Sequence, residues 1–471
     1  MLKIYNTLTG KKEDFKPLSR KKVNFFVCGP TVYDFSHIGH ARTYIAFDVI
    51  CRYLKEKGYD VFYLQNITDI DDKIIKRAKE KNINWKELAR RFEKEYLKDM
   101  KLLGVNSVKK YARATSHIKE IISQVGRLLK KGYAYQISDG IYYDISKFKD
   151  YGKLSRRTAL MAQDAVSRID ESKEKRNKGD FCLWKFSKPD EPKWKSPWGY
   201  GRPGWHIEDT AITEKYFGAQ YTIHGGARDL IFPHHEAEIA QMEAISNKKP
   251  MVKYWLHTGF LTVNRQKMSK SLKNFITIND FLKKHSPFIL RFFVLKSHYR
   301  SPVDYSEKII SQIREEKEKI SEFVERIENC QRLKKSKERK TDISAIIKRA
   351  KLDFEKAMDD DFNTPKAIAA IFKFINKINP FLVDKKISRS EAKRILKLFN
   401  WFNKILGLPV EKKKQIKIPQ EILCLVEKRE RCRQQKKWKE ADEIRKELNE
   451  LGYTLEDIEN NKTIIRIKDK N

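Results

Sequence analysis

Three residues near the N-terminus have side chains that could carry chemistry. Cys28, His37 and His40 lie in the stretch "CGPTVYDFSHIGHAR", which spans residues 28–42. One thiol and two imidazoles at this spacing could hold a single metal ion, because both groups are common zinc ligands. They could equally belong to two different sites that share one loop. Residues elsewhere in the chain decide between these two interpretations.

The segment "HIGH", His37 to His40, lies between a predicted buried strand at 23–27 and a predicted helix that stops at Gly58. A helix N-terminus offers N–H groups to a phosphate, and Gly39 lets a ligand approach the backbone closely. Two imidazoles about one turn apart could donate to phosphate oxygens as negative charge builds. For this segment alone, two solvent-facing histidines at a turn are the alternative.

A second loop follows the strand-like segment "GFLTVN" at 259–264. "KMSKS", from Lys267 to Ser271, places two lysines and two serines in five residues. Such a cationic loop is suited to holding a pyrophosphate as it leaves. Alone it is one more basic stretch in a lysine-rich chain. Together with "HIGH", it predicts a site that handles phosphates.

The elements that must position these loops alternate between strand and helix. Strands are expected at 23–27 and 59–72, with a helix between them, and a third strand pattern resumes at 216–226. This order predicts an α/β domain with a parallel sheet. Between the second and third strands, a helix at 116–132 and a hairpin turning at Asp139 and Gly140 predict an insertion.

The pattern past residue 305 is almost wholly helical. An amphipathic, highly charged helix is expected at 309–333, and another at 343–358. A basic linker at 406–419 precedes a small helix-rich module that ends in a possible short strand at 463–470. The chain is therefore expected to end in a helical region and a separate small module.

Composition narrows the class of protein. The chain of 471 residues has a formal net charge of +37, which favours polyanionic partners over basic ones. A general bias toward lysine in the proteome is the alternative origin of this charge. We find no apolar run of about eighteen residues that would predict a membrane span, and no signal-peptide pattern. The six cysteines lack the regular spacing of a disulfide framework, which is typical of free thiols in a reducing cytoplasm.

The combination of "HIGH" and "KMSKS" resembles the signature of class I aminoacyl-tRNA synthetases. Seven segments are similar in order and spacing to those of cysteinyl-tRNA synthetases over nearly the whole chain. They are "CGPTVYDFSHIGHAR", "NITDIDDKI", "GRPGWHIED", "HGGARDLIFPHHEAEIAQ", "KMSKSLKNF", "SHYRSPVDYS" and "MDDDFNTPKAI". The resemblance implies an α/β fold: a Rossmann-like parallel-sheet catalytic domain with an inserted α+β subdomain, then a helical bundle and a small C-terminal anticodon-binding module.

The resemblance also implies where these parts begin and end. The expected ranges are 1–95 and 201–262 for the two halves of the catalytic domain, 96–200 for the inserted connective subdomain, 263–308 for the KMSKS loop and stem-contact region, 309–408 for the helical bundle, and 409–471 for the linker and anticodon-binding module.

The activity implied by the resemblance has two steps. ATP and L-cysteine condense to cysteinyl-adenylate and pyrophosphate, and the terminal ribose of tRNA(Cys) then takes the cysteinyl group. His37 and His40 would stabilise the phosphoryl transition state, while Lys267 and Lys270 would hold the leaving pyrophosphate with Mg²⁺. The implied ATP-binding residues are Gly39, His40, Gly226, Asp229, Lys267, Met268, Ser269, Lys270 and Ser271.

The implied amino-acid pocket contains Cys28, Gly29, Thr68 and Trp205. Four of the positions carried over have ordinary structural alternatives. Thr68 could cap a strand end, Trp205 could pack in the core, and the glycine and aspartate of "GGARD" could form a turn.

A metal site is expected beside this pocket. His234 and Glu238 are four residues apart at a predicted helix start, so they share one face and form a workable pair of zinc ligands. From the residues alone, an ordinary helix N-terminus is the alternative. The resemblance implies that zinc also binds Cys28 and a cysteine directly after "WHIE". In this chain that position is Asp209.

Asp209 changes the expected ligand set. Zinc accepts carboxylate oxygen, so Cys28, Asp209, His234 and Glu238 could still close the site with one sulfur instead of two. The rival interpretation is a weakened or absent metal, with Asp209 accepting a hydrogen bond. Zinc would select the substrate, because it binds a thiolate far better than a hydroxyl and pocket shape alone separates cysteine poorly from serine.

The C-terminal module carries the expected contacts to the anticodon. The stretch "RCRQQKKWKEADEIRKELNELGYTLED" mixes residue types that stack on unpaired bases or read their edges, although a plain charged helical hairpin is the alternative. The resemblance implies anticodon contacts at Arg433, Trp438, Asp442, Arg445 and Asp457. The usual end of the family, Thr-Thr-Trp-Arg, reads Thr463-Ile464-Ile465-Arg466, which removes one stacking residue.

These inferences predict a cytoplasmic, monomeric ligase of L-cysteine and tRNA(Cys). One alternative is a related ligase that joins cysteine to a sugar amine, but such enzymes lack an anticodon module. The other is a catalytically inactive RNA-binding relative, against which the intact "HIGH" and "KMSKS" loops argue.

Overall fold

The computed structural model describes residues 1–157, 172–268, 272, 274–332, 343–384, 386–409, 419–458 and 462–467. The chain divides into two compact units, residues 1–409 and 410–471. Each unit is described by itself.

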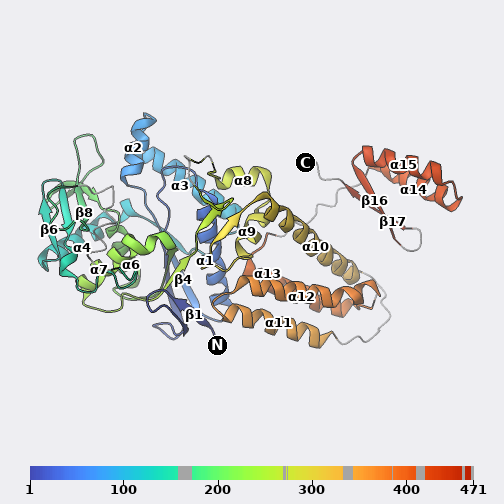
Figure 1. The fold of residues 1–471 in the computed structure, drawn as a ribbon, viewed down its shortest axis with the longest axis horizontal. Coiled ribbons are helices and arrows are strands. Elements are labelled where there is room, and N and C mark those ends of the chain that lie inside the picture. Colours follow the sequence, from blue (N-terminus) through green and yellow to red (C-terminus); the bar gives the residue numbers. More distant parts are fainter. Residues whose placement is uncertain are drawn as a thin grey trace. The chain divides into compact units, whose positions relative to one another are not determined.

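A parallel five-stranded sheet forms the centre of the first unit, in the order β12-β11-β3-β4-β5 (Figure 1). Every neighbouring pair in it is parallel. Its strands are β3 (Lys22–Val27), β4 (Asp60–Ile67), β5 (Lys110–Arg113), β11 (Tyr221–Ala227) and β12 (Val252–Thr258). The predicted Rossmann-like α/β domain is thereby confirmed, since the strand order reverses direction between β3 and β11.

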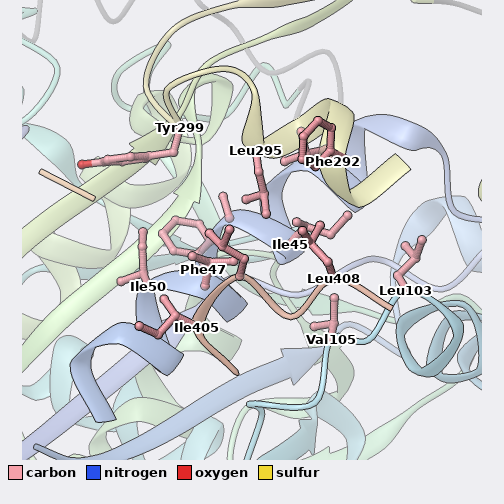
Figure 2. Close-up of a cluster of buried hydrophobic side chains, with 14 of the residues drawn as sticks. Ile45, Phe47, Ile50, Leu103, Val105, Phe292, Leu295, Tyr299, Ile405 and Leu408 are labelled. Atoms are coloured by element: carbon pink, nitrogen blue, oxygen red, sulfur yellow. The ribbon is translucent and has the colours of Figure 1, made fainter. Parts of the chain in front are cut away.

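Helix α1 (Ile38–Glu56) follows β3 and occupies the place that the sequence predicts. Most of its residues are buried, because it lies against the sheet on one side and against the helical part of the unit on the other. Figure 2 shows its side chains Ile45, Phe47 and Ile50 in one cluster with Leu295 and Ile405 from two later helices.

The inserted region forms a second sheet, antiparallel, in the order β6-β7-β8-β10-β9. Its strands are β6 (Ala134–Ile137), β7 (Gly140–Tyr143), β8 (Phe181–Phe186), β9 (Trp194–Ser196) and β10 (Gly199–Pro203). Helices α4 (Ile118–Lys130), α6 (Ile207–Phe217) and α7 (Glu236–Ser246) pack on one another beside it. The predicted hairpin is present, with Ser138 and Asp139 linking its strands.

The junction between the parallel sheet and the insertion differs from the expected range. β5 lies within 96–200 yet is the fifth strand of the parallel sheet. It was missed because it is only four residues long and exposed at its start. Two helices precede it, α2 (Asp72–Glu80) and α3 (Trp85–Leu102).

Two small sheets and two helices complete this half of the unit. The sheets are β1 (Lys3–Asn6) with β2 (Lys11–Asp14), and β14-β13-β15, formed by β13 (Leu261–Val263), β14 (Gln266–Lys267) and β15 (Val303–Tyr305). The helices are α8 (Ile278–Lys284) and α9 (Pro287–Leu295).

A helical bundle follows, and Figure 1 shows its helices side by side. They are α10 (Glu307–Arg332), α11 (Ser344–Asp359), α12 (Thr364–Val383) and α13 (Arg389–Leu406). The bundle shares one continuous hydrophobic core with α1 and α9, which ties it to the parallel sheet. Among the helices of the described ranges, none has the length and apolar content needed to cross a membrane.

The second unit has a small core of its own. Helices α14 (Gln420–Gln434) and α15 (Trp438–Glu450) pack on the hairpin of β16 (Tyr453–Ile458) and β17 (Lys462–Ile467). Ile422, Val426, Ile444 and Leu448 are among its buried residues. The short strand predicted near the C-terminus is confirmed as β17.

Candidate functional site

The candidate site lies at the carboxyl ends of β3 and β11. In open parallel sheets, ligands bind where the strand order reverses, and that point lies between these two strands. Cys28 directly follows β3, and its N–H donates to the carbonyl oxygen of Gly225 in β11 at 3.1 Å. Tyr44 of α1 donates its hydroxyl to the Cys28 carbonyl oxygen at 3.3 Å. The Tyr44 ring lies nearly parallel to the His40 ring, with the two centroids 6.3 Å apart. Tyr44 therefore joins the thiol end of the site to the histidine turn.

The histidine turn is built by the first residues of α1. His37 is the N-cap, and its Nδ1 accepts from the N–H of Gly39 at 3.1 Å. His40 reaches back, with Nδ1 accepting from the N–H of His37 at 3.3 Å. This reciprocal pair has the arrangement of a capping box. Because both Nδ1 atoms accept, each ring carries its proton on Nε2 and presents a donor there.

The two imidazole rings stack with their centroids 3.8 Å apart. Burial lowers the pKa of His40 well below its ordinary value, and the neighbouring His37 lowers it further. His40 is thus neutral at physiological pH and acts as a hydrogen-bond donor rather than as a cation.

Part of the KMSKS loop lies against this turn. A Cβ on Gly39 would lie 2.8 Å from two atoms of the His37 ring, so the turn leaves no room for a side chain there, and Cε of Met268 lies 3.6 Å from the same point. Lys267 ends β14 with an exposed side chain. Ile38 also donates to the carbonyl oxygen of Ile276 at 3.1 Å, just past the loop. Ser269, Lys270 and Ser271 lie outside the described residues.

A buried cluster that could hold a metal ion lies at the other end of the site. It consists of Cys28, Asp209, His234 and Glu238, whose ligand atoms lie within 4.8 Å of one another. Oδ2 of Asp209 is 3.3 Å from Cys28 Sγ and 3.1 Å from His234 Nε2, which in turn is 3.1 Å from Oε1 of Glu238. A tetrahedral metal with bonds of about 2.0 to 2.3 Å separates its ligands by roughly 3.3 to 3.8 Å. The spacing is close to these values.

The electrostatics of the cluster also fit a cation. Burial raises the pKa of Cys28 and of Glu238, and Asp209 raises both further. Among the described residues, Oδ1 of Asp209 and Oε2 of Glu238 accept no hydrogen bond although both atoms are buried. Acidic groups held together in a dry interior are costly without a counter-charge, so these residues fit a bound divalent metal.

Side chains around the cluster orient its only imidazole ligand. His234 Nδ1 lies 2.7 Å from Nδ1 of His206, which leaves Nε2 of His234 facing the two carboxylates. Trp205 stacks on the His234 ring at 4.3 Å. Partners of this kind fix the orientation of a metal-binding histidine. His206 was not predicted, although it stands in the same "GWHIED" segment as Trp205 and Asp209.

Two further histidines face the same thiol and were also missed. Nε2 of His224 lies 3.2 Å from Cys28 Sγ, and Nε2 of His235 lies 3.1 Å from it. With Cys28 and Glu238 they form a second set of possible metal ligands. The signal was present in "HGGARDLIFPHHEAEIAQ", but spacing singles out only His234 and Glu238. Neither set in the described residues includes His37 or His40, so the opening stretch contributes to two regions rather than to one metal site.

The remaining predicted residues lie at different depths. Thr68, buried at the end of β4, donates to the carboxylate of Glu208, which adjoins Asp209. Gly29 has no room for a side chain, because a Cβ would overlap the Asn66 carbonyl. Gly226 is similarly closed by the His235 ring, 2.6 Å from where a Cβ would be. Asp229 is exposed on the turn Arg228–Leu230.

The predicted anticodon residues lie on α14, α15 and β16. Trp438, Asp442 and Arg445 are exposed at spacings of four and three along α15, so they share one face, beside the face that buries Ala441 and Ile444. Trp438 is 58% exposed, which is high for so large an apolar side chain. Arg433 is half-buried on α14, and Asp457 lies in β16 opposite Thr463.

Three family models match consecutive parts of the chain. Residues 14–315 match the class I (C) tRNA synthetase catalytic domain, and residues 353–411 match the DALR domain. Residues 417–464 match the cysteinyl-tRNA ligase anticodon binding domain.

Curated relatives match over almost their whole length. A cysteine--tRNA ligase of Thermococcus gammatolerans is 48% identical over 99% of this chain and 99% of its own. Proteins of the same name are 47% identical in Methanococcus maripaludis, over 97% of each chain, and 44% identical in Thermodesulfovibrio yellowstonii, over 99% of this chain and 100% of its own.

Solved structures support the fold. A methionyl-tRNA synthetase of Mycobacterium tuberculosis, in complex with methionyl-adenylate, superposes with a TM-score of 0.61 at 16% identity, over 82% of this chain and 90% of its own. A LeuRS of Agrobacterium radiobacter in a ternary complex reaches 0.61 at 12% identity, over 84% and 85%. The family models and the full-length identities together place this chain in the cysteinyl-tRNA synthetase family of class I.

Proposed function

We propose that the chain ligates L-cysteine to tRNA(Cys) in two steps, by forming cysteinyl-adenylate from ATP and then transferring the cysteinyl group to the terminal ribose. One observation carries this proposal: Tyr44 joins the residue that supplies the thiol of the buried cluster to the histidine turn, which lies beside Met268. The first feature suits a thiol substrate and the second suits phosphate. The full-length relatives named cysteine--tRNA ligase support the same assignment.

The chain's own groups account for the first step. The cysteine carboxylate attacks the α-phosphorus of ATP, and pyrophosphate leaves. His37 and His40 donate Nε2–H to phosphate oxygens as charge builds on them, which lowers the barrier without a proton being transferred. Lys267 neutralises the leaving pyrophosphate together with Lys270 and the Mg²⁺ that accompanies ATP.

We propose zinc as the metal of the buried cluster, held by Cys28, Asp209, His234 and Glu238. Two observations support zinc: Oδ1 of Asp209 and Oε2 of Glu238 are buried with no hydrogen bond from any described residue, and the ligand atoms lie at a suitable spacing. Bound there, zinc would accept the thiolate of the substrate and so separate cysteine from serine. Gly29, Thr68 and Trp205 would close the pocket around the substrate.

The zinc proposal is tested by metal analysis of the purified protein without chelators. Wild-type protein and Asp209→Cys are expected to hold about one zinc per chain, with tighter retention in Asp209→Cys because thiolate is the softer ligand. Asp209→Ala is expected to lose most of its metal. Active wild-type protein that contains no zinc would overturn the proposal.

The ligase proposal is tested with two assays. Cysteine-dependent exchange of pyrophosphate into ATP is expected, with serine inactive, and so is aminoacylation of a transcript with a GCA anticodon. Exchange without aminoacylation of any tRNA would favour the sugar-amine ligase, and absence of exchange would favour the inactive relative. The anticodon-module match argues against the former alternative.

The contacts to tRNA are also proposals. Trp438, Asp442 and Arg445 on α15, with Arg433 and Asp457, would bind the anticodon, while Gly226 and Asp229 would contact ATP. We further propose a location in the cytoplasm, which the free state of all six cysteines supports, and a monomeric state. Analytical ultracentrifugation at micromolar concentration tests the monomer.

A further inference from the structure

Two family-like segments have no role in the reaction as described so far. "SHYRSPVDYS" and "MDDDFNTPKAI" stand more than fifty residues apart, yet they meet at Asp361, which is fully buried. Its carboxylate accepts from the Tyr299 hydroxyl at 2.9 Å and from Nε of Arg300 at 2.6 Å. It also accepts from the N–H of Tyr5 at 2.8 Å, so it joins three segments of the first unit.

The backbone at this point is held in an unusual form. Asp361 has φ of +62° and Phe362 has φ of +52°, and two consecutive left-handed residues other than glycine are unfavourable. The N–H of Asp361 donates to the carbonyl oxygen of Lys3 at 2.9 Å. Several hydrogen bonds therefore keep the carboxylate aimed at the loop 298–301.

The same loop is held from its other side by α1, the helix that begins at the histidine turn. Arg42, two residues after His40 and buried, donates through its guanidinium to the carbonyl oxygens of Gly259, Tyr299 and Ser301. The Tyr299 carbonyl oxygen also accepts from the N–H of Gly259 at 2.8 Å. Tyr299 thus contacts Asp361 through its side-chain hydroxyl, and it contacts Arg42 of α1 through its backbone carbonyl oxygen.

From this loop the contacts continue to the strand that carries Lys267. Gly259 leads into β13, and a Cβ there would lie 2.4 Å from the Ser301 carbonyl oxygen, so the two backbones are in direct contact. β13 pairs with β15, and the Thr262 hydroxyl donates to Asp304 at 2.6 Å. Thr262 is in turn the strand partner of Lys267.

We propose that Asp361 is a positioning residue for the ATP side of the reaction. The charge of its carboxylate holds the loop 298–301 in place. That loop in turn fixes the distance between α1, which begins at the histidine turn, and β14, which carries Lys267. This inference rests on the proposed ligase function. Figure 2 places Tyr299 in the buried cluster with Leu295 and Phe47, so the loop is also packed against α1. The effect of Asp361 should therefore fall on ATP and not on cysteine, whose pocket lies at the cluster around Cys28.

The test compares Asp361→Asn with Asp360→Asn in cysteine-dependent pyrophosphate exchange, well below the melting temperature. Asp360 is a matched control, since it is the adjacent carboxylate and forms ion pairs with Lys12 and Lys366 at the surface. Asp361→Asn is expected to lower kcat/KM for ATP by about ten- to a hundredfold, the scale of a small misplacement of reacting groups. The KM for cysteine should stay within about twofold.

A second variant covers the case in which Asp361→Asn does not fold. Tyr299→Phe keeps the packed ring and removes one hydrogen bond to Asp361, and it is expected to show the same selective effect on ATP at a smaller size. In both variants hydrogen exchange should quicken at residues 261–267 and not at residues 207–217.

Two outcomes would overturn the proposal. One is a lowered melting temperature with kcat/KM for ATP unchanged, which would make Asp361 merely structural. The other is an equal loss for ATP and cysteine. Failure of the ligase function is a separate result, because wild-type protein would then show no exchange while the hydrogen-exchange comparison would still report on the loop.

Discussion

At the scale of single residues, the phosphate side of the site depends on how two imidazoles are fixed. His37 and His40 each use Nδ1 to accept a backbone N–H, so both rings are oriented before any ligand arrives. Burial keeps the pKa of His40 below its ordinary value. A neutral, fixed donor strengthens its hydrogen bond only when charge develops opposite it, which is the requirement for stabilising a transition state.

His40→Ala is therefore expected to lower kcat of pyrophosphate exchange by about a hundred- to a thousandfold, with little change in KM for ATP. Steady-state exchange kinetics measure this, and the melting temperature checks that the fold is retained. His40→Asn, which restores a donor, should recover part of the loss.

The lowered pKa of His40 also predicts a pH response. In a folded chain whose His40 pKa lies below 6.5, acidification from pH 8 to pH 6.5 does not protonate this ring. The pH profiles of kcat should accordingly agree near pH 6.5: the wild-type protein should show no ionisation there that is missing from His40→Asn. Finding such an ionisation would contradict a neutral His40.

At the scale of elements, a buried ion pair joins α1, α9 and the end of α13. Asp48 and Arg291 are both fully buried and bonded to each other. Arg291 also donates to the carbonyl oxygens of Leu406 at 2.7 Å and Leu103 at 3.1 Å. Burial alone would raise the pKa of Asp48, but Arg291 and Arg52 outweigh it and lower the pKa. The bundle is thus attached to the sheet by a charged contact as well as by the shared core.

Within the described part of the chain, Arg291→Met leaves the partly exposed Arg52 as the one ion-pair partner of Asp48. The expected loss is about 3 to 5 kcal/mol in the free energy of unfolding, as for other buried pairs broken on one side. Denaturant unfolding measures it. As a control, Lys404→Met removes an exposed partner of Glu56 and should cost about 0 to 1 kcal/mol. Equal losses in the two variants would contradict a special role for the buried pair.

At the scale of the whole molecule, two units with separate cores divide the proposed task. Residues 1–409 contain the histidine turn, Lys267 and the metal-binding cluster, whereas residues 410–471 contain α15 with its exposed Trp438. The net charge of +37 on the whole chain favours an approaching polyanion. Activation of cysteine and recognition of tRNA should therefore be separable by substitution.

Trp438→Ala in the full chain is expected to lower kcat/KM for aminoacylation by about five- to a hundredfold, the range of one lost base-stacking contact. Pyrophosphate exchange without tRNA provides the integrity check and should continue. A transcript with an altered anticodon should lose less in the variant than in wild type. An identical loss in both proteins would show that Trp438 does not read the anticodon.

Much of the fold could be predicted because its signals are local. The strand predicted at 23–27 and the helix predicted to stop at Gly58 are present as β3 and α1, because apolar spacing and a terminating glycine act within about thirty residues. Two strands of the parallel sheet, β5 and β12, were not predicted, and the four residues of β5 are too few to give a periodic signal. For the site, contiguity made "HIGH" and "KMSKS" recognisable, and the ligand roles of Cys28 and Asp209 came from the family resemblance.

The sequence by itself therefore determined the strand–loop–helix order, the two phosphate-side loops and the spacing of His234 and Glu238. Only the tertiary structure decided that Asp209 lies within 3.3 Å of a thiol 181 residues away, that His224 and His235 face the same sulfur, and that Asp361 meets Tyr299. The physical reason is that periodicity and caps depend on neighbours along the chain. A buried cluster depends on which strand ends the parallel crossovers bring together, and no local pattern encodes that.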